Sequence, residues 1–154
     1  MKVLIHWLII ASVGLILMSC SNNASHLHNS NDPSLPKNIG IKGYSPVSYF
    51  EHNRAERGKA DHQYTYKNRV YYFTSAAQVE TFKQTPDAYL PKFGEYCPYS
   101  LSLGRRVAID PTNFKIQNDE LLLFHSSVEL ATIDIPRQQD ILNKAEHQFK
   151  LWDL

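Results

Sequence analysis

The stretch HQYTYKNRVYYFTSAAQVETFKQ, residues 62–84, decides the fold. Its first half is rich in Tyr, Thr and Val, and side-chain character alternates along it, which predicts two strands over residues 62–66 and 70–73. The three residues between them suit a tight turn, because Asn68 tolerates a positive φ angle. The stretch therefore predicts an antiparallel hairpin.

Helix signals flank this hairpin on both sides. Ser75, followed three residues later by Gln78, is typical of a capping box and predicts a helix that runs to about Gln84. Residues 85–87, with a central proline, predict the start of another short helix. Upstream, Ser45 followed by a proline predicts a short helix through Phe50.

The second half of the chain predicts similar elements. Residues 94–103 suggest one or two helical turns, and residues 107–109 an extended segment that stops at Asp110. Residues 114–116 and 121–124 predict a second hairpin, and apolar spacing predicts a last helix over 137–152. The expected fold class is α+β, with a small antiparallel sheet of two hairpins packed with several short helices and a C-terminal helix. No internal repeat is predicted.

The N-terminus resembles a bacterial lipoprotein signal peptide. Lys2 precedes an apolar run over residues 7–18, which is shorter than the roughly 20 residues that span a bilayer. The run ends in Leu17-Met18-Ser19-Cys20, which is similar to a lipobox. The resemblance implies cleavage before Cys20 and attachment of fatty acyl chains such as palmitate, which anchor the chain to a membrane.

The chain is accordingly divided into three parts. Residues 1–19 are the expected signal peptide, and residues 20–38 are the lipidated cysteine and a flexible tether rich in Asn, Ser and Pro. Residues 39–154 are the expected globular domain. Ser21 follows the lipidated cysteine, and in the enteric sorting rule a residue other than Asp directs the protein to the outer membrane, facing the periplasm.

Composition limits the partners and points to one cysteine. A formal net charge of +1 and the lack of a basic cluster make nucleic acid an unexpected partner. The chain has 2 cysteines, and lipidation of Cys20 leaves Cys97 without a disulfide partner. A lone thiol in an oxidising compartment is buried, liganded or reactive, so Cys97 is the residue to explain.

Four segments in order resemble the YHS-domain family. Residues 43–50, GYSPVSYF, are similar to G-Y-D-P-V-A-Y-F, and residues 64–89 resemble the aromatic hairpin, helix and P-x-x-Y of the family core. Residues 91–99, PKFGEYCPY, resemble P-x-Y-G-G-Y-C-A-Y, and a segment beginning at Asp110 resembles D-P-x-x-W-x-I. The matching positions include Tyr44, Tyr96 and Asp110. The resemblance covers about residues 40–125.

The resemblance leaves the ligand open. Some YHS domains bind metal through F-C-S-x-x-C, but Thr74 and Gln78 stand at those two cysteine positions here. Hydroxyl and amide groups are poor ligands for soft metals, so that site is expected to be lost. A copper or zinc ion held by Cys97 with His62 or His125 is one hypothesis. A second is that Cys97 is a buried, inert thiol. A third is that Cys97 is a redox or catalytic nucleophile, with a His as base and Asp110 as orienter.

The sequence thus favours a membrane-anchored envelope lipoprotein with a YHS-like domain that binds a ligand or metal and is not an enzyme. The alternative is a non-catalytic envelope protein that binds another protein, with Cys97 purely structural. The Asp110-Pro111 pair is expected to form a turn with the carboxylate capping nearby amides. The Arg105-Arg106 pair is interpreted as solvated, with an anion site as the alternative.

Overall fold

A computed structural model of the chain describes residues 33–133 and 138–152. It confirms the α+β class: two antiparallel two-stranded sheets pack with six helices, the last of them C-terminal. The predicted signal peptide, Cys20 and most of the tether lie outside the described residues. None of the described helices combines the length and the apolar character that crossing a membrane requires.

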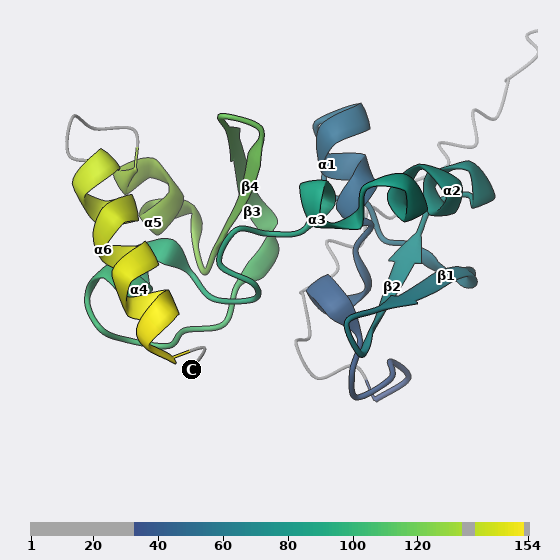
Figure 1. Ribbon diagram of the computed structural model, residues 1–154, viewed down its shortest axis with the longest axis horizontal. Coiled ribbons are helices and arrows are strands. Elements are labelled where there is room, and N and C mark those ends of the chain that lie inside the picture. The colour runs from purple at the N-terminus through teal and green to yellow at the C-terminus, as the bar shows by residue number, and fades with distance from the viewer. Residues whose placement is uncertain (1–32, 134–137, 153–154) are drawn as a thin grey trace, which may run out of the picture.

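The arrangement along the chain is helix, hairpin, helices, and then the same again (Figure 1). The elements in order are η1 (Gly40–Gly43), α1 (Pro46–His52), β1 (Lys59–Tyr66), β2 (Arg69–Phe73), α2 (Ala76–Gln84), α3 (Pro86–Tyr89), α4 (Pro98–Ser102), β3 (Asp110–Gln117), β4 (Glu120–Phe124), α5 (Ser127–Thr132) and α6 (Gln138–Trp152).

Most predicted elements form close to their expected positions, with three differences. β1 begins at Lys59 because an irregularity after that residue extends the pairing. Asp110 begins β3 and pairs with Phe124, so the prediction that the extended segment stops there is wrong. Its carboxylate still caps as expected, accepting hydrogen bonds from the backbone and hydroxyl of Thr112 at 2.9 and 2.8 Å. Helix α5 was not predicted.

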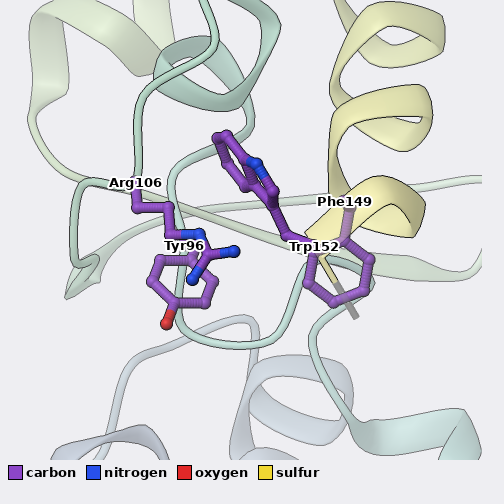
Figure 2. A pocket seen from close by; sticks show the side chains of 4 residues that line it. All are labelled: Tyr96, Arg106, Phe149 and Trp152. Atoms are coloured by element: carbon purple, nitrogen blue, oxygen red, sulfur yellow. The ribbon is translucent and has the colours of Figure 1, made fainter. Parts of the chain in front are cut away.

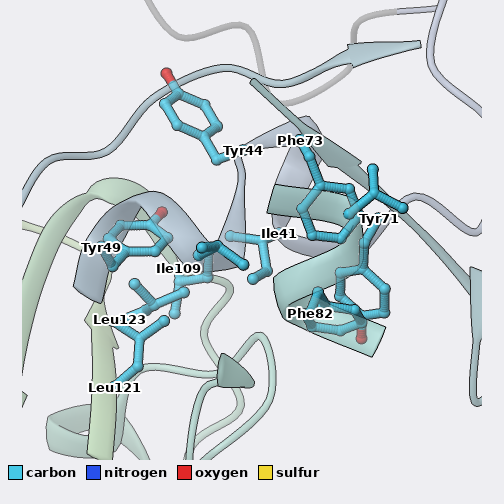
Figure 3. Packing of buried hydrophobic residues seen from close by; sticks show 11 residues of the cluster. Ile41, Tyr44, Tyr49, Tyr71, Phe73, Phe82, Ile109, Leu121 and Leu123 are labelled. Atoms are coloured by element: carbon cyan, nitrogen blue, oxygen red, sulfur yellow. The ribbon is translucent and has the colours of Figure 1, made fainter. Parts of the chain in front are cut away.

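One hydrophobic cluster lies between the first hairpin, α1 and α2 (Figure 3). Phe82 of α2 is 0% exposed and packs against the inward-facing rings of β2. Tyr71 and Phe73 supply those rings, because alternate residues of a strand point to the same face. This packing fixes α2 across the first sheet.

β4 is buried on both faces and joins two clusters. Leu121 and Leu123 enter the first cluster, whereas Leu122 and Phe124 enter a second cluster with α4 and α6. A strand with both faces covered needs apolar residues at successive positions. This explains why residues 121–124 read LLLF without alternation.

The turn η1, in the N-terminal half of the domain, contacts the C-terminal half that begins after α3. Ile41 and Lys42 have φ angles of 49° and 50°, which is an unfavourable conformation for side chains other than glycine. The second half holds this turn: the Ile41 N–H donates to Glu95 Oε1 at 3.0 Å, and Lys42 Nζ donates to the carbonyl of Ile109 at 2.6 Å. The carboxylate of Glu95 is therefore engaged in the fold.

The second hairpin repeats the register of the first. The pairs are Lys59 with Phe73, Gln63 with Tyr72, Tyr64 with Tyr71, Thr65 with Val70 and Tyr66 with Arg69, and then Asp110 with Phe124, Phe114 with Leu123, Lys115 with Leu122, Ile116 with Leu121 and Gln117 with Glu120. Each residue of the second set stands 51 positions after its counterpart. Even the irregularity after the first pair recurs.

The elements around the hairpins repeat as well. Ser75 and Ser126 each cap the following helix, accepting from the N–H three residues on at 3.3 Å. Ser45 and Cys97, 52 positions apart, each precede a proline that starts a helix. Their backbone N–H groups donate to the backbone carbonyls of Glu56 and Val107, both at 2.9 Å.

The prediction of no internal repeat is therefore wrong. The repeat preserves backbone pairing, turns and caps, while the core positions exchange aromatic for aliphatic side chains. Tyr71 corresponds to Leu122, and Phe82 corresponds to Ile133. Such exchanges keep each position buried but remove most of the identity by which a repeat is recognised in sequence.

Candidate functional site

Cys97 is buried at the start of α4. It is the residue before the first helical turn, is 0% exposed, and packs in the second cluster. Burial raises the pKa of the Cys97 thiol, and the backbone N–H groups of Ser100 and His125 act in the opposite direction without cancelling it. A thiol with a raised pKa stays protonated at neutral pH, so it is a poor nucleophile and a poor metal ligand.

The internal repeat identifies what Cys97 replaces. Its counterpart is Ser45, which is also 0% exposed and donates from Oγ to Gln78 Oε1 at 2.8 Å. In the second half, Ser100 Oγ donates to Glu129 Oε1 at 3.0 Å, where Glu129 is the counterpart of Gln78. Both halves thus place small polar side chains between the start of one helix and the next helix. This position is a packing junction in each half.

The repeat predicts a small effect for Cys97→Ser. The variant restores the side chain that the first half uses at the same place, so we expect unfolding free energy to change by about 1 kcal/mol or less. Ser45→Cys is the matched reciprocal variant and should behave similarly. Thermal unfolding of the full chain in detergent micelles measures both. A loss above about 3 kcal/mol in Cys97→Ser alone would contradict the equivalence.

The two histidines proposed as metal ligands do not converge with Cys97 into a cluster. His62 is half-buried on β1 of the first sheet, whereas His125 follows β4 and is exposed. Nδ1 of the His125 ring lies 3.0 Å from the carbonyl oxygen of Ala108. The group of His125 that contacts the Cys97 thiol is its backbone N–H. Within residues 33–133 and 138–152, no group of three or more His, Cys, Asp and Glu side chains is placed to hold a metal ion.

Tyr44 and Tyr96, the two tyrosines that resemble YHS-family positions, both lie in backbone bridges of the fold. Tyr44 and Tyr96 are counterparts, and each forms an isolated antiparallel bridge, with Arg57 and Ala108 respectively. Tyr44 is 9% exposed, and the guanidinium of Arg57 lies over its ring, 5.1 Å from the centroid. Tyr96 is 38% exposed. The two copies of one position therefore differ in access to solvent, and Tyr96 lines a pocket.

An open pocket lies at the C-terminal end of α6 (Figure 2). Its volume is about 100 Å³, and its lining residues are Tyr96, Arg106, Phe149 and Trp152. Phe149 and Trp152 stand three residues apart on α6, so they project from one face of the helix. The guanidinium carbon of Arg106 lies 4.5 Å from the centroid of the Trp152 ring. The pocket thus combines aromatic walls with one cation.

The walls of this pocket are fixed by the second cluster. The ring of Phe149 packs edge-on against buried Phe93, with centroids 5.9 Å apart and planes at 88°. Gly94 lies beneath Phe149, and a Cβ there would be 3.9 Å from the ring, in ordinary contact. The aromatic surface is therefore held by the core rather than by solvent-exposed loops alone.

A second, larger hollow lies between α4 and α6. Its volume is about 510 Å³, and its lining residues are Tyr99, Ser102, Leu103, Thr132, Asp140, Ile141 and Lys144. The two charged residues pair with each other, since Lys144 Nζ lies 2.7 Å from Asp140 Oδ2. That pairing leaves little charge to orient a ligand, in contrast to Arg106, whose contact in the described part of the chain is an aromatic ring.

Sequence reasoning missed this pocket as a unit. Phe149 and Trp152 were predicted on the apolar face of the last helix, and Arg106 as a solvated charge with an anion site as the alternative. Their convergence with Tyr96 depends on how α6 packs along α4, which no local pattern encodes. A comparison of the chain with protein-family models, curated proteins and solved structures found no match.

Proposed function

We propose that the chain is an envelope lipoprotein, anchored through Cys20, whose YHS-like domain is a non-catalytic binding module. The ligand enters the pocket formed by Tyr96, Arg106, Phe149 and Trp152, rather than a site at Cys97. The observation that carries the proposal is this pocket, where aromatic walls and a cation without a carboxylate partner in the described part of the chain face solvent. The burial of Cys97 supports it by removing the thiol from reach.

Two alternative functions are a metal carrier and a protein-binding module. A copper or zinc site at Cys97 needs several converging ligands, and the described residues offer no such group. A protein-binding module needs a contiguous surface, and the most exposed large apolar residues of the described part come from separate segments: Leu103 follows α4, Val128 is on α5 and Leu151 is on α6. Single exposed apolar side chains are common and do not define an interface.

Native mass spectrometry tests the proposal against the metal reading. The full chain is extracted from membranes in mild detergent, beside the Trp152→Ala and Cys97→Ser variants. The proposal predicts a bound organic mass that Trp152→Ala loses and Cys97→Ser keeps. A bound metal mass that disappears in Cys97→Ser would overturn it in favour of a metal carrier.

Lipidation predicts a complete effect at Cys20. Metabolic labelling with palmitate should mark the wild-type chain and leave Cys20→Ala unlabelled, because the acyl chains attach to that cysteine. Cys97→Ala is the matched control and should keep the label. Label of equal strength on Cys20→Ala would show that the anchor lies elsewhere.

A further inference from the structure

We infer that the pocket at the end of α6 selects a carboxylate carried on a flat apolar body, such as an aromatic carboxylate. The inference rests on the proposed function, which places the ligand in this pocket, and adds the chemical class of that ligand. Three properties of the pocket carry it: the contact of its cation with an aromatic ring, the engagement of the carboxylate next to Tyr96 in the sequence, and the nature of its walls.

The cation of the pocket, Arg106, lies against an aromatic ring. Arg106 is exposed, and its guanidinium rests over Trp152 at 4.5 Å from the ring centroid. A guanidinium that packs on an aromatic face keeps its N–H donors directed outward in its own plane, where they match the two oxygens of a carboxylate. Within residues 33–133 and 138–152, no carboxylate forms an ion pair with it.

The neighbouring acid is committed to the fold. Glu95 precedes Tyr96 of the pocket, but its Oε1 lies 3.0 Å from Arg69 Nη1 and also accepts from the backbone of Ile41. It is therefore held by the η1 turn, away from competition for Arg106. An anion is favoured here, and a quaternary or primary ammonium is disfavoured.

The walls select for a flat apolar group. Tyr96, Phe149 and Trp152 supply three aromatic rings, and aromatic rings prefer stacked or edge-on contact with other flat groups. The pocket is small, at about 100 Å³, so a compact group fits it better than a long lipid chain. A fully hydrated phosphate would leave these walls unused, and a single arginine gives it few donors.

The test uses Trp152 as its own reporter. The chain has 2 tryptophans, and Trp7 lies in the signal peptide that the proposed function removes, so the mature lipoprotein has Trp152 as its single indole. It is titrated in detergent micelles with benzoate, with neutral benzyl alcohol and with inorganic phosphate while tryptophan emission is recorded. We expect benzoate to change the emission saturably, benzyl alcohol to bind about tenfold more weakly, and phosphate to give no response.

Variants separate the charge from the pocket. Arg106→Gln should lower benzoate affinity about tenfold and leave benzyl alcohol unchanged, because it removes a charge-assisted hydrogen bond. Arg105→Gln is the matched control and should have little effect. Equal affinity for benzoate and benzyl alcohol, or a phosphate response as strong as that of benzoate, would overturn the carboxylate inference while leaving the pocket in place. No response of Trp152 to any probe would overturn both the inference and the proposed site.

Discussion

Replacing Phe82 by alanine is expected to lower the unfolding free energy by about 3–5 kcal/mol, the largest effect of any single substitution considered for this chain. Phe82 is 0% exposed and belongs to the first cluster. Ring centroids lie between 5.1 and 6.3 Å away for Tyr64, Tyr66, Tyr71, Phe73 and Tyr89. Truncation leaves a cavity that five large rings cannot fill without leaving their rotamers.

Urea unfolding of the full chain in detergent micelles, followed by circular dichroism, measures this loss. Phe82→Leu is the matched control, because it keeps most of the apolar volume and should cost about 1.5 kcal/mol or less. An unchanged midpoint in Phe82→Ala would contradict the placement of α2 across the first sheet.

Gln78→Ala is expected to cost about 3 kcal/mol, which is large for a polar residue. The side chain is 3% exposed and connects α1 to α2. Its Oε1 accepts from Ser45 Oγ at 2.8 Å and from the Thr74 N–H at 3.2 Å, and its Nε2 donates to Ser48 Oγ at 3.1 Å. Alanine would leave these buried groups without partners, and each unsatisfied group costs about 1–3 kcal/mol.

The matched control for this prediction is on the same helix. Gln84 is exposed at the end of α2, and Gln84→Ala should change stability by about 0.5 kcal/mol or less. Thermal unfolding of Gln78→Ala and Gln84→Ala under the same conditions compares the two losses of stability. Equal losses would mean that the buried amide contributes no more than a surface one, and that the junction between α1 and α2 is held by apolar packing alone.

Local signals in the sequence predicted most of the fold. The hairpin over Lys59–Phe73 and the helix capped by Ser75 follow from alternation, turn chemistry and capping, which act within a few residues. Helix α5 has the same kind of capping signal, since Ser126 is followed three residues later by Glu129. This helix could therefore have been predicted from the sequence but was not. The repeat was missed because geometry, rather than residue identity, carries it.

The site was harder to predict because it depends on tertiary packing. The sequence marks Cys97 as a lone thiol, but its burial depends on the packing of α4 and α6. Its interpretation as a packing residue depends on comparison with its counterpart Ser45. The pocket draws Tyr96 and Arg106 from the segments on either side of α4, and Trp152 from the end of α6. No pattern within one segment brings these side chains together.

The most direct test of the central claim, that Cys97 is a structural residue and that ligands bind elsewhere, is its rate of alkylation. The native full chain is treated with iodoacetamide beside the urea-unfolded chain, and peptide mapping reads modification at Cys97 alone. We expect labelling at least about a hundredfold slower in the native chain, because the buried thiol reacts only after local or global opening. Labelling of the native chain at nearly the unfolded rate would contradict it and return Cys97 to the candidate site.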